Sequence, residues 1–198
     1  MVRKYKPSDE DSWCRCRVLS FLRSSYFDDV LQAKPTYQHP SVELVFEEDH
    51  TIVGLLDIEW EETPGSVCQG RAEQGAMIWN LAVHPDHQRR NIASSLLEEA
   101  LAELSRHHIA FIDAWTRDDV SANAWYTDNG FETIEEYVHA YYTSSEAKRL
   151  FSTSERGLVP VHVFAHLVGD VSEIARKQAS RWHACRLYRR ELLTQAAR

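Results

Sequence analysis

Apolar residues along the chain switch between the period of a strand and the period of a helix. Residues 92–106 carry apolar side chains three and four positions apart, with glutamates on the opposite side, which predicts an amphipathic helix. Residues 76–83 before it and 109–115 after it are apolar runs of strand length. We expect the two strands to lie in one sheet, with the helix crossing over between them.

The rest of the chain supplies further elements around this centre. Ser41 to Glu48 and Thr51 to Trp60 alternate like strands and are joined at Asp49-His50, which predicts a hairpin. The other expected strands are 2–5, 133–143 and 159–167, the other helices are 9–22, 26–31 and 121–128, and 63–75 and 152–157 read as loops. This order predicts a mixed α/β sheet covered on both sides.

Residues 170–198 have a helical pattern and a locally basic composition. Their apolar members are Ile174, Trp182, Leu187, Tyr188 and Leu192. We therefore divide the chain into a domain at 1–169 and a C-terminal helical extension at 170–198, which packs on the domain or on a dimer mate because that apolar surface is unfavourable in water. A dimerisation arm or a site for an acidic partner remains open.

Composition narrows the class of protein. The 198 residues, 43% hydrophobic and 26% charged, fit one globular domain, or one domain with an appendage. A net charge of -8 argues against general nucleic-acid binding, because phosphate contacts need a basic face. The chain has neither an apolar run long enough to span a membrane nor a signal-peptide core, so we expect a cytoplasmic protein. The scattered cysteines and the histidine pairs His162/His166 and His107-His108 lack a ligand set, so we expect no metal.

The most informative segment is the polar loop His84 to Asn91, which leads from the strand at 76–83 directly into the long helix. The unpaired N–H groups at a helix N-terminus and the helix dipole favour an anion such as pyrophosphate. The segment therefore predicts a binding site for the pyrophosphate of a coenzyme.

This segment resembles the GNAT superfamily of acetyl-CoA-dependent N-acyltransferases. The family pattern V-x-P-x-x-[QR]-x-x-G-x-[GA] is matched by Val83, Pro85, Gln88, Asn91 and Ala93, with Asn in place of the first Gly. A second pattern, A-x-x-[LFW]-Y-x-x-x-G-F, is matched by Ala122, Trp125, Tyr126, Gly130 and Phe131. Two motifs in the right order are far more specific than either alone. The resemblance implies a mostly antiparallel sheet of about seven strands flanked by helices.

The resemblance also implies acetyl-CoA as co-substrate and assigns residues to it. The backbone of Leu81, Ala82 and Val83 would pair with the pantetheine arm as a strand would. The pyrophosphate would be held by the turn and helix start made of Gln88, Arg89, Arg90, Asn91, Ile92, Ala93 and Ser94. Asn91 tolerates the left-handed conformation but brings a side chain that must turn away from the phosphate. We therefore expect Asn91 to affect the affinity for the coenzyme more than the identity of the ligand.

Acyl transfer needs a neutral amine, a donor for the oxyanion and a proton for the departing thiolate. Tyr126 stands where the family carries its tyrosine proton donor, and Val83 where it carries the backbone donor. The alternative for Tyr126 is an aromatic core pair with Trp125. The family's frequent glutamate aligns with Trp79, which cannot accept a proton.

Three carboxylates are candidate substitutes for that base: Glu59, Asp57 and Asp113. The sequence does not choose among them, and a neutral amine would need no base. Asp57, Glu59 and Glu61 alternate along one strand face, so this row and the negative field favour a cationic acceptor beside Asp57 and Trp79.

The sequence thus predicts an N-acetyltransferase that moves an acetyl group to a primary amine of a small molecule or peptide in a ternary complex. One alternative is a catalytically silent acyl-CoA-binding regulatory module. The other is a GNAT-type toxin or protein acetylase whose macromolecular partner docks on the basic C-terminal helix.

Overall fold

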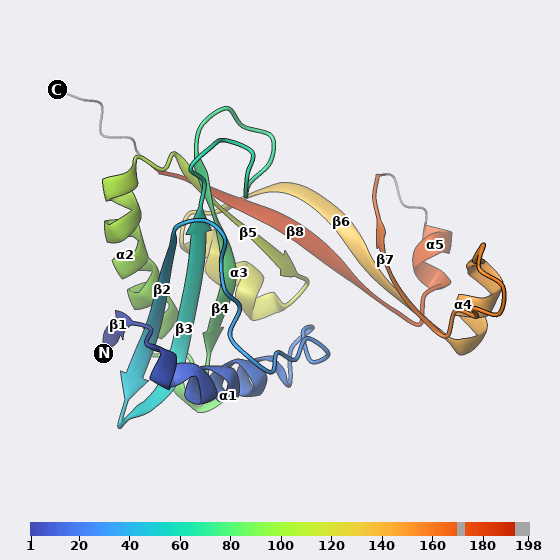
Figure 1. The fold of residues 1–198 in the computed structure, drawn as a ribbon, viewed down its shortest axis with the longest axis horizontal. Coiled ribbons are helices and arrows are strands. Elements are labelled where there is room, and N and C mark those ends of the chain that lie inside the picture. Colours follow the sequence, from blue (N-terminus) through green and yellow to red (C-terminus); the bar gives the residue numbers. More distant parts are fainter. Residues whose placement is uncertain (170–172, 193–198) are drawn as a thin grey trace.

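A single open sheet forms the centre of the molecule (Figure 1). The computed structural model describes residues 1–169 and 173–192, and in this part of the chain the sheet has eight strands in the order β1-β2-β3-β4-β5-β8-β6-β7. The strands are β1 (Val2–Lys4), β2 (Ser41–Glu48), β3 (Thr51–Trp60), β4 (Gly75–Val83), β5 (Phe111–Arg117), β6 (Glu132–Thr143), β7 (His162–Leu167) and β8 (Arg181–Glu191). Every pair of neighbours is antiparallel except β4 and β5, which confirms the expected mixed, mostly antiparallel sheet.

Helices cover both faces of the sheet (Figure 1). On one face α1 (Glu10–Phe21) buries Trp13 and Cys16 against Val45 and Leu55 of the sheet. On the other, the apolar stripe of α2 (Ile92–Leu104) meets the main core, and α3 (Val120–Asp128) contributes Tyr126 to it. Three 3-10 turns, Pro7–Asp9, Pro85–His87 and Ser105–His107, flank α1 and α2. The side chain of Asp119 caps α3 by accepting a hydrogen bond from the Ala122 amide at 3.0 Å.

The parallel pair β4 and β5 separates halfway along β4. Pairing runs from Gly75 opposite Phe111 to Ile78 opposite Ala114, and β4 then continues alone on that side to Val83. The register between β3 and β4 shifts at the same point: Ile58 pairs with Ile78 and Asp57 with Asn80, which leaves Trp79 as an extra residue. Such a bulge bends a strand and re-aims a side chain. The sheet therefore opens into a wedge at Trp79.

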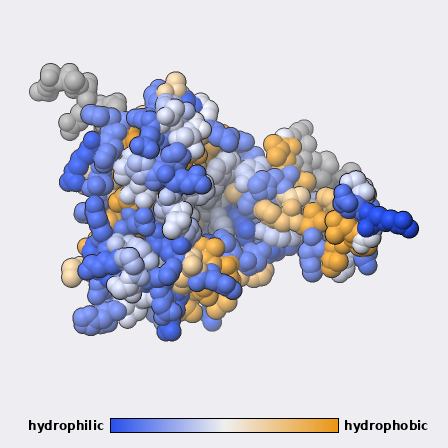
Figure 2. All heavy atoms as spheres, in the orientation of Figure 1, coloured by the Kyte–Doolittle hydropathy of each residue, from blue (hydrophilic) through white to orange (hydrophobic). Residues whose placement is uncertain are grey.

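The far ends of β6 and β8, with β7, extend from the body as an arm (Figure 1). Two helices, α4 (Ser144–Leu150) and α5 (Glu173–Lys177), belong to it. Its small apolar core is separate from the main core and consists of Ala140, Tyr142 and Ala147 with Phe151, Val163, Ala165, Leu167 and Ala179. Figure 2 shows apolar atoms gathered on the arm, where Leu158, Val159, Val161, Phe164, Val168 and Trp182 are exposed.

Several sequence-based expectations are wrong. Arg181–Glu191 is not helical but forms β8, which pairs with β5 and β6. Among the described residues of 170–198, only the short α5 is helical. Residues 26–28 form turns and residues 29–31 have no regular structure, so the helix expected there is absent. The strand expected at 159–167 begins only at His162, and α4 was not expected. Residues 170–172 and 193–198 of the expected extension lie outside the described residues. None of the described helices has the length and apolarity needed to cross a membrane.

Candidate functional site

A cavity of about 890 Å³ fills the wedge between β4 and β5. One wall is the separated end of β4 and another is the loop and first turn of α2, while α3 and the segment from Arg17 to Asp29 complete it. Of the residues predicted to bind coenzyme, the cavity is lined by Leu81, Ala82, Val83, Gln88, Arg89, Asn91, Ile92, Ala93 and Ser94. The sequence motifs therefore converge on one cavity.

The first turn of α2 presents its backbone to this cavity. Asn91, the residue before the helix, has φ 61° and ψ 15°, so it adopts the left-handed conformation expected from the missing glycine. Arg89 is also left-handed, with φ 58°. No side chain of the described residues caps the helix start, so its first N–H groups remain available to an anion.

The loop before α2 is tied to the end of β2. Glu48 accepts hydrogen bonds from Arg90 at 2.6 and 3.0 Å and lies 2.7 Å from His87 Nδ1. Gln88 Nε2 donates to the Val83 carbonyl at 3.3 Å. Arg90 therefore braces the loop and does not line the cavity with the other predicted coenzyme residues, whereas Arg89 does.

The β4 backbone from Trp79 to Val83 forms a free strand edge along the cavity, because its pairing with β5 ends at Ile78. Leu81, Ala82 and Val83 line the cavity there. An unpaired strand edge offers N–H and C=O groups to an extended chain that contains amides.

Tyr126 closes the cavity on the α3 side. Its ring stacks on Tyr188 with centroids 5.2 Å apart and meets Phe131 edge to face at the same separation. Its hydroxyl makes no hydrogen bond to any described residue, and burial raises the pKa of Tyr126 above its ordinary value. The hydroxyl is therefore a neutral donor. Neighbouring Trp125 connects α3 to α2, since its Nε1 donates to Ser94 Oγ at 3.1 Å.

Trp79 separates the cavity from a smaller pocket of about 380 Å³, and it lines both. Its side chain is 51% exposed, and its Nε1 donates to Glu59 Oε2 at 2.7 Å. Glu59 lines only the smaller pocket, where its other oxygen accepts the amide N–H groups of Gln38 and His39 at 2.9 and 2.8 Å. Glu59 and Tyr126 thus lie on opposite sides of Trp79.

Asp57 lies in a buried polar cluster between β3 and α1. Its side chain is fully buried and accepts the Tyr37 hydroxyl at Oδ2, at 2.9 Å, and Lys34 Nζ lies 3.4 Å from the same oxygen. Oδ1 has no partner in the described part of the chain. Burial raises the pKa of Asp57 to about 6, although Lys34 opposes the shift. Asp57 lines neither pocket, but Tyr37 lines the smaller one.

The other two carboxylates of the predicted set are committed elsewhere. Asp113 forms a bidentate pair with Arg189 at 2.7 Å on both oxygens, away from both pockets. Burial nevertheless raises the pKa of Asp113. Glu61 accepts four backbone N–H groups at 2.7 to 3.0 Å, three from the loop after β3 and one from the first residue of β4. The expected carboxylate row is therefore buried in separate networks and does not form one open acidic surface.

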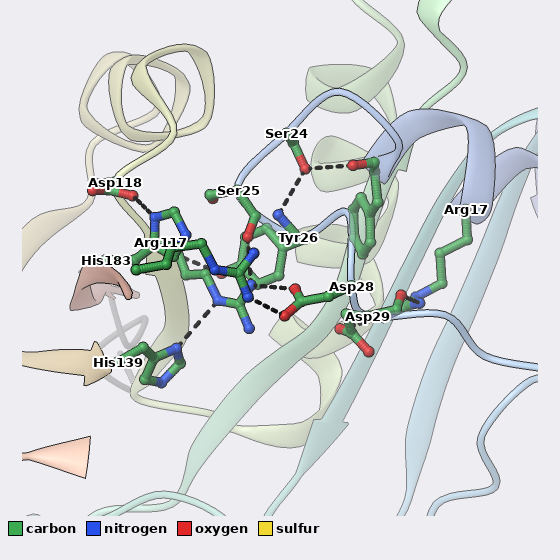
Figure 3. Close-up of polar contacts among 12 residues, drawn as sticks. Arg17, Ser24, Ser25, Tyr26, Asp28, Asp29, Arg117, Asp118, His139 and His183 are labelled. Atoms are coloured by element: carbon green, nitrogen blue, oxygen red, sulfur yellow. Dashed lines mark hydrogen bonds and ion pairs between the residues drawn. The ribbon is translucent and has the colours of Figure 1, made fainter. Parts of the chain in front are cut away.

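The turns at 24–29 form a wall that the sequence did not reveal (Figure 3). Arg17 donates to Asp29 Oδ2 at 2.8 Å, and the Tyr26 hydroxyl accepts the Arg117 amide at 2.7 Å. Asp28 binds Arg117 at 3.0 Å and also pairs with Arg181 of the arm. The sequence gives little sign of this wall, because Arg117 and Arg181 lie 89 and 153 positions away from Asp28.

Residues 40–133 match the family model of the acetyltransferase (GNAT) domain. No curated protein sequence matches the chain. Among solved structures, the fold is similar to a ribosomal-protein alanine N-acetyltransferase from Escherichia coli, with a TM-score of 0.59, 13% identity and coverage of 100% of this chain and 96% of that one.

Two further solved structures have the same fold. The PaiA N-acetyltransferase of Thermoplasma acidophilum, in complex with coenzyme A, gives a TM-score of 0.52 at 13% identity and covers 68% of this chain and 90% of its own. NAA60 of Arabidopsis thaliana, in complex with a bisubstrate analogue, gives 0.57 at 13% identity over 98% and 99% of the two chains. At these identities the similarity concerns the fold.

Proposed function

We propose that this chain, of which residues 40–133 match the acetyltransferase (GNAT) domain and whose fold is similar to that of solved N-acetyltransferases, moves an acetyl group from acetyl-CoA to a primary amine of a small molecule or peptide. The amine attacks directly while both substrates are bound. The observation that carries the proposal is the single cavity that unites the start of α2, the free edge of β4 and Tyr126.

The residues that line the cavity fit coenzyme A. The free N–H groups at the start of α2 suit its pyrophosphate, and Arg89 adds positive charge beside them. The edge at Leu81, Ala82 and Val83 suits the two amides of pantetheine. When bound, the coenzyme supplies an acetyl thioester whose carbonyl the amine attacks.

Tyr126 and the β4 backbone serve the chemistry. A neutral tyrosine hydroxyl free of other hydrogen bonds can donate its proton to the departing thiolate. The Val83 backbone lies along the same wall, where an N–H group would stabilise negative charge on the carbonyl oxygen.

The acceptor side begins at Trp79. The smaller pocket on its far side contains Glu59 as its acidic group, together with Tyr37 and His39. Negative charge beside aromatic rings favours a cationic amine. Two structural neighbours are described as N-acetyltransferases, and two others are in complex with a bisubstrate analogue, which supports an amine or peptide acceptor.

The experiment pairs a thermal-shift titration with coenzyme A against release of free thiol from acetyl-CoA over a panel of amines. Binding raises the melting temperature because the ligand stabilises the native state only. We expect both a shift and amine-dependent thiol release. A shift without thiol release on any amine would instead support the silent acyl-CoA-binding module, for which Trp79 at the glutamate position is the motivating observation. No shift at millimolar coenzyme would overturn both readings.

A further inference from the structure

The buried cluster around Asp57 holds more negative than positive charge. Lys34 Nζ lies 2.5 Å from Glu43 Oε2 and 3.4 Å from Asp57 Oδ2, so one ammonium faces two carboxylates. Arg17, which reaches the cluster through its hydrogen bond to Asn80, is paired with Asp29 at 2.8 Å. The Glu43 side chain is 31% exposed, whereas the Asp57 carboxylate is fully buried and shares its only ammonium partner among the described residues with Glu43. A proton on Asp57 would therefore remove a buried charge that is only partly compensated.

Tyr37 connects this cluster to the smaller pocket. Its hydroxyl donates to Asp57 Oδ2 at 2.9 Å and accepts the Asn80 amide at 3.2 Å. A hydroxyl oxygen has two lone pairs, so one remains for a further donor. Tyr37 lines the smaller pocket, and Trp79 borders both this pocket and the main cavity, so an amine that enters by way of the smaller pocket would pass Tyr37.

We propose that Tyr37 takes the proton from the acceptor ammonium and passes its own hydroxyl proton to Asp57. This inference rests on the proposed function and supplies the base that the sequence lacks at Trp79. As the N–H bond of the ammonium breaks, Tyr37 Oη gains that proton and loses its own to Asp57 Oδ2. The products are a neutral amine, an unchanged Tyr37 and a neutral Asp57, and the reverse route returns the proton to water after product leaves.

The surroundings of Asp57 suit a temporary proton site. Burial holds the pKa of its carboxyl near 6, so the group is ionised but close to protonation at neutral pH. The unpartnered Oδ1 leaves the carboxylate less strongly stabilised than Glu61, which accepts four N–H groups. The polar groups that face Asp57 are Lys34 and Tyr37 from the loop before β2, Glu43 from β2, Asn80 from β4 and, behind Asn80, Arg17 from α1.

The test compares Tyr37→Phe with Tyr5→Phe on two acceptors of similar size. Tyr5 is a matched control because its ring lies 4.9 Å from Lys34, like that of Tyr37, yet its hydroxyl does not contact Asp57. One acceptor is an alkylamine, protonated at neutral pH, and the other is a hydrazide, whose amine is already neutral. The readouts are kcat, KM and the thermal shift with coenzyme A.

We expect Tyr37→Phe to lower kcat on the alkylamine about 10²-fold or more, the range of general-base assistance, with little change on the hydrazide. Tyr5→Phe should resemble the wild type on both. The acid limb of the wild-type pH profile on the alkylamine should reflect Asp57, and Asp57→Asn should remove the alkylamine reaction selectively.

An equal loss of kcat in Tyr37→Phe on both acceptors would mean that Tyr37 only shapes the pocket. An unchanged kcat of this variant on the alkylamine would place the proton route elsewhere. Either result overturns the inference while the proposed function stands. If no amine in the panel increased the release of thiol from acetyl-CoA by the wild-type protein, the proposed function itself would be overturned. If Asp57→Asn does not fold, the Tyr37→Phe comparison still decides, because that change keeps the ring and the Lys34 cluster.

Discussion

At the scale of single residues, Tyr126 offers the sharpest test of the chemistry. Its ring packs on Tyr188 and Phe131, while its hydroxyl makes no hydrogen bond to the described residues. Tyr126→Phe therefore keeps the packing and removes only the proton donor. We expect kcat to fall by about 10²- to 10⁴-fold, with coenzyme binding and melting temperature nearly unchanged.

The matched control is Trp125→Phe in the same helix. It removes the hydrogen bond from the indole to Ser94 Oγ and part of the packing between α3 and α2, so it should lower stability more than it slows the chemical step. A wild-type kcat in Tyr126→Phe, on an amine for which chemistry limits the rate, would leave Tyr126 a packing residue.

Local residues of the site were predictable and distant ones were not. The turn into α2 was readable because its parts are contiguous, and even the left-handed Asn91 followed from its replacing a glycine. Tyr37 and Arg17 carried no such signal. Tyr37 acquires its role from a contact with Asp57, 20 positions away, and Arg17 from a contact with Asn80, 63 positions away. Only the fold brings these residues together.

At the scale of elements, β8 explains why the C-terminal segment was misread. Arginines on both faces of the strand hid its alternation. Arg189 is buried because it pairs with Asp113 at 2.7 Å, and Arg186 pairs with Glu136 at 2.8 Å. Asp113 and Glu136 lie far upstream in the chain, so the sequence pattern predicted that these arginines form the solvated face of a helix. By contrast, α2 was predicted almost to its ends because one periodic stripe faces one core.

The loop between β3 and β4 is organised by Glu61, and a second prediction tests this. Its Oε1 accepts the amides of Gly65, Val67 and Cys68, while Oε2 accepts that of Gly75. In Glu61→Gln one of these oxygens becomes an NH₂ donor that faces a backbone donor. We expect a loss of about 1–3 kcal/mol in the free energy of unfolding, measured by urea denaturation.

The pH dependence of that loss has a definite sign. Burial tends to raise the pKa of Glu61, but the four backbone donors outweigh it and the net shift is downward. A depressed pKa in the folded state gives stability that is present above the unfolded pKa and disappears as the pH falls through the folded one. The difference between wild type and Glu61→Gln should therefore shrink in acid. Glu62→Gln, at an exposed neighbour, should change little at any pH.

At the scale of the whole molecule, the body and the arm have separate cores. The main core lies between the sheet, α2 and α3, whereas the arm packs Ala140, Tyr142 and Ala147 against β7 and α4. The strands β6 and β8 belong to both parts, since they pair over Glu132 to Tyr141. The body therefore needs β8 but not the arm beyond Tyr141.

This separation predicts the result of removing the outer arm. Tyr141 and Arg181 are paired across β6 and β8, so residues 142–180 can be replaced by Asn-Gly, which favours a two-residue hairpin turn. The contacts of Arg181 with Asp28 and of His183 with Asp118 are retained, so the arm base stays attached to the body. We expect a cooperatively folded protein whose melting temperature still rises with coenzyme A.

The contrasting variant ends the chain at Ser180 and so removes β8. It exposes the edges of β5 and β6 and takes Leu187 and Tyr188 out of the buried interior, and we expect it not to unfold cooperatively. Calorimetry and coenzyme titration of both variants test the division. A hairpin variant that fails to fold, beside a folded chain ending at Ser180, would reverse the assignment and make the outer arm the part on which the sheet depends.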